Sequence, residues 1–259
     1  MVRAVRRFPL IIGHRGASRE APENTLAAFR LAWEGGADGI EADFRLTGDG
    51  RIVCVHDART KRTANRDLAV AHTTLGELRQ LDAGGWKGER WRGEKIPTLT
   101  EVLDISPPGK RLFLEIKSGA EILPPLMREL AGREAAREGV TLLSFSAPLV
   151  AACKERLPEI QTCWLTDYRR SRSSGKLRPT GEEILATLAR LGADGLASRA
   201  HRALDADLVD ALREAGLSVH VWTVDALVRA RHFAALGVDS IMTNRPGWLK
   251  THLASHEPY

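Results

Sequence analysis

Short apolar runs alternate with amphipathic stretches along most of the chain. The apolar runs have the length and the few polar positions of buried strands, and they lie at 9–13, 39–45, 111–116, 140–145, 160–165, 195–197, 218–222 and 240–243. Between them, apolar residues recur at helical spacing, at 25–34, 122–137, 148–156, 181–191, 205–215 and 226–236. Strands of this kind separated by helices predict a parallel sheet covered on its faces.

Three of the helix-to-strand joints share one short pattern. They are Gly36-Ala-Asp-Gly-Ile40, Gly192-Ala-Asp-Gly-Leu196 and Gly237-Val-Asp-Ser-Ile241. Each first glycine suits the left-handed position that ends a helix, and the last apolar residue opens the next strand. This repeat, together with the strand candidates, favours an α/β fold of the closed (β/α)8 TIM-barrel type. An open doubly wound sheet is the alternative.

The length of 259 residues suits one large domain, and no Gly/Ser-rich or Pro-rich linker divides the chain. We therefore expect a single domain over residues 1–259 rather than two smaller ones. Two segments interrupt the strand–helix alternation. The segment 57–97 is too long for a simple loop and is expected to be functional or to carry its own structure. The segment 167–179 contains a basic run at 169–176, for which a solvated loop is favoured over a lid.

Charge and cysteine content narrow the class of protein. The net charge of +5 favours anionic partners, which include nucleic acid, small phosphate esters and anionic membrane surfaces. Cys54, Cys153 and Cys163 lack metal-ligand spacing, so we expect reduced thiols in a cytoplasmic protein. The apolar run 8–12 is too short for the core of a signal peptide, and no segment reaches the length of a membrane span. Stable membrane insertion is therefore not expected.

Carboxylates gather at the ends of two predicted strands. Glu41 and Asp43 are two residues apart on one strand, so their side chains share a face, and Glu115 and Lys117 repeat this spacing on the next barrel strand. Crowded carboxylates raise one another's pKa or demand a cation. A hard ion with oxygen ligands, Mg²⁺ or Ca²⁺, fits this set of donors. For any one of these acids taken alone, a salt bridge or a helix cap is the alternative.

Two histidines lie at the same predicted edge of the sheet. His14 closes the first strand, and His56 follows the apolar run 52–55. Two histidines flanking an acidic cluster suit a general acid and a general base, while a hydrogen-bonded structural role is the alternative for each. Asp57 either orients His56 or is an exposed turn residue.

Other polar and aromatic residues near these positions have less specific roles. Arg15 offers a planar fork to a phosphate, and Lys117 offers a point charge. Trp222 ends another strand and forms either an apolar wall for a small substrate or part of the core. His220 points to the same face and is left without a role. For the segment 22–25 before the first helix, capping and a structural role suffice.

An ordered series of motifs runs along nearly the whole chain. It consists of His14-Arg-Gly-Ala, Pro22-Glu-Asn-Thr, Gly36-Ala-Asp-Gly-Ile-Glu-Ala-Asp43, Thr47-Gly-Asp-Gly, Val55-His-Asp, Ile96-Pro-Thr-Leu, Glu115-Ile-Lys, Ser144-Phe, Trp222-Thr-Val and Ile241-Met-Thr-Asn-Arg-Pro. Taken together, these motifs closely resemble the glycerophosphodiester phosphodiesterase family, from about residue 11 to residue 246.

The resemblance implies a TIM barrel with an extra segment inserted at 57–97. It also implies that one divalent cation, Mg²⁺ or Ca²⁺ with Mn²⁺ as a further candidate, is held by Glu41, Asp43 and Glu115. His14 and His56 would be the acid–base pair. By the same analogy Arg15 and Lys117 would hold the phosphate, and Trp222 remains a candidate for substrate contact.

The expected reaction is hydrolysis of a glycerophosphodiester to sn-glycerol 3-phosphate and an alcohol, within glycerophospholipid and glycerol metabolism. The nucleophile is either water or the substrate's own neighbouring hydroxyl. Trp86 and Trp91 in a basic protein suggest a lipid-directed alternative of the lysophospholipase D or phospholipase type. A noncatalytic barrel that binds nucleic acid or another anion is disfavoured, because the concentrated carboxylates would repel phosphate. We therefore expect a small-molecule substrate and no nucleic-acid partner, and the sequence does not predict the oligomeric state.

Overall fold

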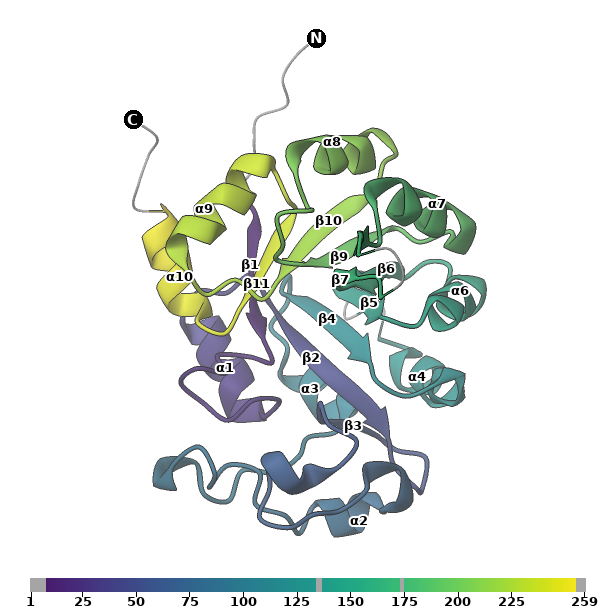
Figure 1. Cartoon of the computed structure of the whole chain (residues 1–259). Helices are drawn as coiled ribbons and strands as arrows, with labels where there is room; N and C mark the ends of the chain where they lie inside the picture. Colours follow the sequence, from purple (N-terminus) through teal and green to yellow (C-terminus); the bar gives the residue numbers. More distant parts are fainter. Residues whose placement is uncertain (1–7, 134–136, 173–174, 255–259) are drawn as a thin grey trace.

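A closed ring of parallel strands forms the centre of the protein. The structure is a computed structural model that describes residues 8–133, 137–172 and 175–254. The ring consists of β1 (Leu10–His14), β2 (Gly39–Leu46), β4 (Arg111–Ile116), β5 (Val140–Ser144), β6 (Gln161–Thr166), β9 (Gly195–Arg199), β10 (Ser218–Trp222) and β11 (Ser240–Thr243). β1 pairs in parallel with both β11 and β2, which closes the sheet on itself. The predicted TIM barrel is thereby confirmed (Figure 1).

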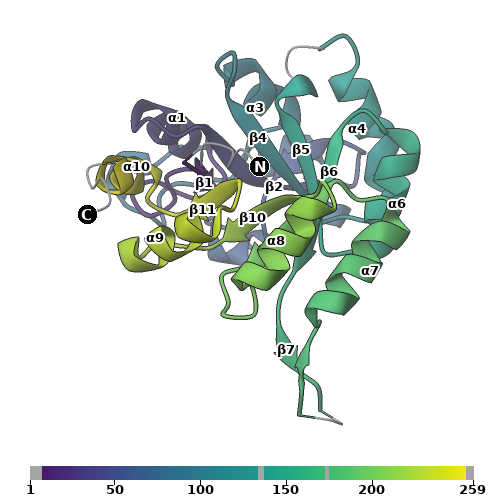
Figure 2. The same cartoon turned by 90° about the horizontal axis from the view of Figure 1, so that it is seen from above.

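Helices surround the ring, as both views show (Figures 1 and 2). They are α1 (Leu26–Glu34), α3 (Leu99–Ile105), α4 (Leu123–Leu130), α6 (Ala147–Arg156), α7 (Gly181–Leu191), α8 (Ala206–Glu214), α9 (Leu227–Leu236) and α10 (Pro246–Ala254). The helix expected over 122–137 is too long, because α4 ends where Ala131 takes an extended backbone; residues 134–136 lie outside the described part. α3 was not expected, although its capping box of Thr98 and Glu101 is a sequence signal.

The segment 57–97 carries its own short elements. It contains η1 (Thr60–Arg62), η2 (Val70–His72), α2 (Leu75–Leu78) and η3 (Glu89–Trp91). β3 (Ile52–Cys54), which leads into this segment, lies in the apolar run 52–55 that precedes His56. It runs antiparallel to β2, so it is not one of the parallel strands of the ring. The segment has a small core that includes Val70, Leu78 and Leu81. It lies beside the β2–β3 end of the barrel (Figure 1).

The basic segment 169–176 forms part of a hairpin rather than an irregular loop. β7 (Arg169–Arg170) pairs antiparallel with β8 (Leu177–Arg178). A left-handed Gly175 (φ 64°) lies between the two strands. The paired arginines are exposed, and the hairpin projects away from the barrel (Figure 2). The prediction that this segment is exposed to solvent is confirmed, whereas the prediction that it is an irregular loop is wrong.

The barrel interior combines apolar side chains with a buried, hydrogen-bonded histidine. Its apolar residues come from alternate positions of the strands and include Ile12, Phe113 and Met242. His220 is buried edge-on against Phe113. Its Nδ1 lies 2.8 Å from the Ser240 hydroxyl, and its Nε2 lies 3.1 Å from the Ser218 hydroxyl. His220 therefore has a structural role in joining the strands, which accounts for a residue left without a role above.

We expect His220 to make folding stability depend on pH. Burial lowers the pKa of His220 from 6.5 to about 4, with Arg111 adding to this effect. The unfolded chain therefore binds the proton more tightly, so the contribution of His220 is complete above pH 6.5 and is lost as the pH falls towards 4. Urea titrations between pH 4 and 7 should show stability that declines less steeply with acid in His220→Gln than in the wild type. Parallel curves for the two proteins would contradict this prediction.

Two further expectations concern the cysteines and the membrane. Cys54, Cys153 and Cys163 are buried free thiols, as the sequence predicts. No helix in the described ranges combines the length and the apolar composition that crossing a bilayer requires.

Candidate active site

The carboxyl ends of β1, β2 and β4 bring the predicted acids and one histidine together. In the ladder, His14 is the Cα partner of Glu41, and Asp43 is the partner of Glu115. Glu41, Asp43 and Glu115 are all buried, and one ligand oxygen from each lies within 4.8 Å of the others. The expectation that strand periodicity would place these carboxylates on one rim is therefore correct. The name rim cluster is used below for Glu41, Asp43 and Glu115.

Glu41 has one oxygen that the protein does not satisfy. Its Oε2 accepts a hydrogen bond from the backbone N–H of Arg15 at 2.9 Å and lies 3.9 Å from Nε2 of His14. Its Oε1 is buried and has no hydrogen-bond partner among the residues that the structure describes. Burial, followed by the charges of Asp43 and Glu115, raises the pKa of Glu41 well above its ordinary value. A buried, unsatisfied carboxylate oxygen in this setting fits a cation ligand.

The other two acids share positive partners. Asp43 Oδ2 lies 3.1 Å from Nε of Arg15, and Asp43 Oδ1 lies 3.2 Å from Nζ of Lys117. Both contacts are ion pairs without hydrogen-bond geometry. Burial alone would raise the pKa of Asp43, but Arg15 and Lys117 bring it down to about 2. Lys117 also pairs with Glu115. Burial and the charge of Asp43 nevertheless raise the pKa of Glu115 to about 7.

Asn24 holds Asp43 in place, a role that the sequence analysis missed. Its amide Nδ2 donates to Asp43 Oδ2 at 2.8 Å, and its Oδ1 accepts from the Asp43 backbone N–H at 3.1 Å and from the Cys54 thiol at 3.2 Å. Asn24 has a left-handed backbone (φ 58°), which asparagine tolerates better than most residues. Thr25 is the N-cap of α1, because its hydroxyl accepts from the Ala28 N–H. The segment therefore does more than cap the helix.

A strained turn aims the backbone of Arg15 at the rim cluster. Arg15 has a positive φ of 56°, which is uncommon for a residue with a side chain. Gly16 follows with φ 82°, and a Cβ at Gly16 would lie 2.7 Å from atoms of Ala28. Only glycine fits at that position. The turn directs the Arg15 N–H to Glu41 and its guanidinium to Asp43 and Glu23.

His14 is oriented by Asn244, which follows β11, and Asn244 is in turn held by Asp225, which follows β10. Asn244 donates from Nδ2 to Asp225 at 2.7 Å, so its Oδ1 faces Nδ1 of His14 at 2.8 Å as an acceptor. His14 therefore donates from Nδ1, and its Nε2 points towards Glu41. Burial, helped by Arg15, lowers the pKa of His14 to about 4. Asn244 belongs to the Thr-Asn-Arg-Pro motif quoted above, but its spatial role was not foreseen.

His56 follows β3 and is oriented by its neighbour. Its Nδ1 lies 2.6 Å from Oδ1 of Asp57, so the orienting role of Asp57 is the correct alternative. Burial lowers the pKa of His56, and Asp43 and Asp57 oppose this effect. Arg45, whose role the sequence did not indicate, donates to the carbonyl oxygens of His56 and Lys117. It thereby connects two loops of the rim.

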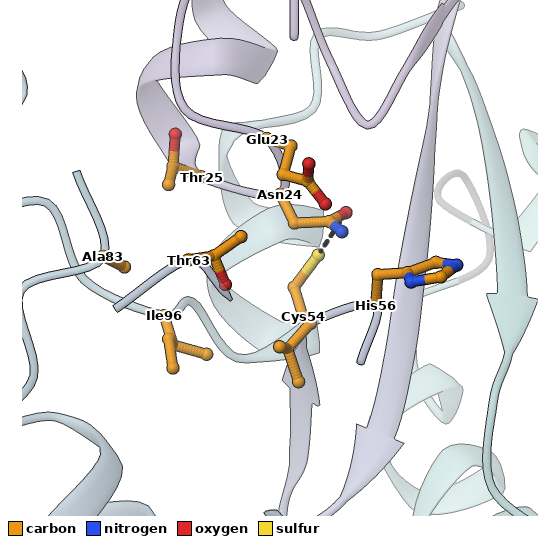
Figure 3. A pocket seen from close by; sticks show the side chains of 9 residues that line it. Glu23, Asn24, Thr25, Cys54, His56, Thr63, Ala83 and Ile96 are labelled. Carbon is orange, nitrogen blue, oxygen red and sulfur yellow. Dashed lines mark hydrogen bonds between the residues drawn. The ribbon is translucent and has the colours of Figure 1, made fainter. Parts of the chain in front are cut away.

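A small cavity lies behind His56, between the barrel and the segment 57–97. Thr63 and Ala83 line it from that segment, and Asn24 and Cys54 line it from the barrel side (Figure 3). The His56 ring is turned away from Cys54 in this view. The volume of about 10 Å³ admits at most one water molecule, so this cavity is too small to be the substrate site.

Trp222 lies at the boundary between the barrel interior and the surface. Its ring meets Phe145 edge-on with centroids 5.6 Å apart, and its Nε1 donates to the Ala197 carbonyl at 3.0 Å. It packs against the interior apolar residues and is half-buried. Phe145 is 46% exposed and lies 5.9 Å from Nζ of Lys117. Trp222 therefore packs on the interior core with part of its ring exposed, so its contact with a substrate stays a prediction, and the exposed Phe145 forms an apolar edge beside Lys117.

Sequence comparison relates this chain to one family of phosphodiesterases. Residues 14–248 match the sequence model of the glycerophosphoryl diester phosphodiesterase family. A glycerophosphodiester phosphodiesterase of Caldanaerobacter subterraneus subsp. tengcongensis is 36% identical over 243 residues, which cover 92% of this chain and 94% of the relative. A glycerophosphodiester phosphodiesterase of Bacillus subtilis is 30% identical over 253 residues, covering 92% of this chain and 84% of the relative.

Solved structures show the same barrel. A phosphodiesterase of Oleispira antarctica, in complex with the product sn-glycerol-3-phosphate, is 29% identical with a TM-score of 0.84; the match covers 96% of this chain and 98% of that one. A glycerophosphodiester phosphodiesterase of Agrobacterium tumefaciens is 28% identical with a TM-score of 0.77, and the match covers 94% and 99% of the two chains.

Proposed function

The chain belongs to the glycerophosphoryl diester phosphodiesterase family, and from this premise we propose that it hydrolyses glycerophosphodiesters to sn-glycerol 3-phosphate and an alcohol. The observation that carries the proposal is the rim cluster, with His14 beside Glu41 and the Arg15 and Lys117 cations beside Asp43. The product bound to the Oleispira antarctica relative supports the choice of substrate class.

One divalent cation is proposed to bind at Glu41, Asp43 and Glu115. The unsatisfied Oε1 of Glu41 and the spacing of the three carboxylates support this assignment. When bound, Mg²⁺, Ca²⁺ or Mn²⁺ would stabilise negative charge on the phosphoryl oxygens as the ester bond breaks. One cluster of three acids favours a single ion over a two-metal arrangement.

Arg15 and Lys117 are proposed to hold the phosphate. The Arg15 guanidinium uses Nε on Asp43 and Nη1 on Glu23, and the contacts that fix it leave Nη2 available to donate to an anion. Lys117 is fixed by two carboxylates and adds a point charge at the same rim. These charges stabilise the phosphoryl group without moving in the reaction, which is the main advantage of a preorganised site.

His14 and His56 are proposed to be the acid–base pair, with different duties. The Nδ1–H of His14 faces the neutral amide oxygen of Asn244, so its Nε2 is suited to accept a proton from the nucleophile. His56 faces the carboxylate of Asp57, which stabilises a protonated imidazole. We therefore assign His14 as the base and His56 as the acid that protonates the leaving alkoxide. Water and the neighbouring substrate hydroxyl remain alternative nucleophiles, and a substrate analogue without that hydroxyl separates them: unimpaired turnover would rule out the hydroxyl route.

We also propose that residues 1–259 form a single cytoplasmic domain. Backbone hydrogen bonds join the segment 57–97 to the barrel; in one of them, the Cys54 N–H donates to the Pro97 carbonyl at 2.8 Å. The free thiols of Cys54, Cys153 and Cys163 are compatible with a reducing compartment. We propose no nucleic-acid partner, because buried carboxylates rather than exposed cations surround the candidate phosphate position.

A metal-depleted assay on a panel of diesters tests the proposed function. The panel contains glycerophosphocholine, glycerophosphoethanolamine, glycerophosphoglycerol and lysophosphatidylcholine, with Mg²⁺, Mn²⁺ or Ca²⁺ added back separately. We expect no turnover without a divalent cation; when one is present, we expect release of sn-glycerol 3-phosphate from the three glycerophosphodiesters, whereas hydrolysis of the lysolipid would release lysophosphatidate. Faster turnover of the lysolipid would favour the lipid-directed alternative, for which the exposed Phe145 and Trp86 are the supporting observation. If no substrate of the panel is hydrolysed with any of the three cations, the proposed function is wrong.

A further inference from the structure

Arg62, in the segment 57–97, joins two parts of the candidate active site. Its Nε donates to Asp57 Oδ2 at 2.6 Å, and its Nη1 and Nη2 donate to the two oxygens of Glu23 at 2.7 and 2.8 Å. Three N–H groups of one rigid guanidinium are therefore used on two carboxylates. Isolated surface ion pairs contribute little, but a planar fork engaged in this way fixes the orientation of both partners.

The Asp57 side of this bridge leads to a catalytic histidine. Asp57 uses one oxygen for Arg62 and the other for Nδ1 of His56 at 2.6 Å. Asp57 is 34% exposed, so packing alone does not hold its carboxylate in one rotamer. The Arg62 contact supplies the missing constraint. Through Asp57, it keeps Nδ1 of His56 as a donor to the carboxylate, so Nε2 is the nitrogen that carries the second proton, the one that the acid transfers.

The Glu23 side leads to the phosphate-binding arginine. Glu23 Oε1 accepts from Arg62 and also from Nη1 of Arg15 at 2.9 Å. Arg62 thus shares the negative charge of Glu23 with Arg15. Without Arg62, that charge would act on Arg15 alone and would bind its guanidinium more strongly, away from a phosphate.

The backbone of Arg62 is itself held firmly. It ends η1, whose first residue Thr60 is buried and donates its hydroxyl to the Arg66 carbonyl at 2.6 Å. The next residue, Thr63, lines the small cavity together with Asn24 and Cys54 (Figure 3). The local structure of the inserted segment therefore determines where the guanidinium is placed.

We propose that Arg62 is a positioning residue, by which the inserted segment orients His56 through Asp57 and tunes Arg15 through Glu23. The inference rests on the proposed function for its kinetic consequences, because it assumes that His56 transfers a proton and that Arg15 binds phosphate. The geometric part, the orientation of His56, is independent of the substrate.

Arg62→Met is the variant that tests this role. It keeps the length of the side chain and removes all three donors. We expect kcat on glycerophosphocholine to fall by about 10- to 100-fold, as for other residues that orient a catalytic ligand, together with a higher KM. Arg62→Lys retains the charge but not the fork, so kcat should stay low; full recovery with lysine would contradict the proposal.

A double-mutant cycle with His56→Ala separates positioning from a general effect on the fold. If Arg62 acts through His56, then Arg62→Met should cause little further loss of kcat when His56 is already absent. An equal loss in both backgrounds would show that Arg62 acts on the fold and would overturn the proposal.

Arg79→Met is the matched control in the same segment. Arg79 joins α2 to Glu101 of α3 at 2.8 Å and donates to the Ile96 carbonyl, so it anchors the segment to the barrel through contacts away from Asp57 and Glu23. We expect this control to lower the melting temperature with kcat unchanged. A loss of kcat equal to that of Arg62→Met would attribute the effect to anchoring of the segment and would contradict the proposal.

Nitrogen NMR of ¹⁵N-histidine-labelled protein tests the geometry without any substrate. At a pH where the His56 ring is neutral, we expect its remaining proton on Nδ1 in the wild type and a mixture of the two tautomers in Arg62→Met. An unchanged His56 spectrum would overturn the positioning role. Because this readout needs no turnover, it decides the inference even if the panel assay shows no activity.

Discussion

Glu41→Gln is expected to lower metal-dependent turnover by about 10³-fold or more, because it removes the charged ligand with an unsatisfied oxygen while preserving the shape of the side chain. The Arg15 N–H can still donate to the amide oxygen of the variant, so the turn at Arg15 should persist. The loss of rate should therefore come from weak cation binding rather than from unfolding.

Without metal, the thermal stability of Glu41→Gln should change in the opposite direction to its activity. Burial and the neighbouring charges of Asp43 and Glu115 raise the pKa of Glu41, which means that the folded protein resists its ionisation. Above the ordinary pKa of the carboxyl, this effect destabilises the metal-free wild type. Glutamine has no charge to bury. In metal-free buffer at pH 8, the Glu41→Gln variant should therefore melt at a higher temperature than the wild type.

The measurement is a thermal melt with and without a divalent cation, run beside the activity assay. The wild type should gain stability when the cation is added, because a ligand that binds only the folded state shifts unfolding, and Glu41→Gln should gain little. Glu89→Gln is the matched control: its 77% exposed side chain pairs with Arg92 on the surface, so the response to cation should be that of the wild type. A full cation response in Glu41→Gln would remove Glu41 from the ligand set.

His14→Ala and His56→Ala should each lower kcat by about 10²- to 10⁴-fold with the fold intact. The reason is the fixed geometry of the two rings, each held at Nδ1 by a partner, Asn244 or Asp57. A variant that keeps a nearly wild-type rate would remove that histidine from the acid–base pair.

A substrate with a nitrophenol leaving group distinguishes the two histidines. Nitrophenolate leaves without being protonated, so the acid is no longer needed, whereas the nucleophile still has to be deprotonated. We expect the rate loss in His56→Ala to shrink markedly on this substrate and the loss in His14→Ala to persist. The reverse result would exchange the two assignments. His72→Ala, at an exposed position of η2, serves as the control with an expected wild-type rate on both substrates.

Local periodicity accounts for the part of the site that was predictable. Glu41 and Asp43 had to share a face because strand side chains alternate, and the parallel arrangement placed Glu115 and His14 at the same rim. The ladder bears this out, with His14 opposite Glu41 and Asp43 opposite Glu115. These positions depend only on residues a few places apart in the chain and on the rule that parallel strands end at one edge.

The partners that orient these residues were not predictable in the same way. Asn244 lies 230 residues from His14, and Arg62 lies 39 residues from Glu23. No periodicity links such positions, since their contacts form only when loops from different strands converge. The left-handed turn at Asn24 is a further case, because its reason is a pair of hydrogen bonds to Asp43 that exist only in the folded protein.

By itself, the sequence determined which residues are candidates for the site: local spacing indicated the rim cluster, and the ordered motifs, through their resemblance to the family, indicated the barrel and the proposed roles of His14, His56, Arg15 and Lys117. Tertiary structure alone decided how each histidine is oriented, that Asp43 is held by Asn24, and that the inserted segment reaches the site through Arg62. The physical reason is that the orientation of a side chain depends on hydrogen-bond partners that only folding brings together. The pKa of a buried or shared carboxylate likewise depends on the charges that the fold places beside it.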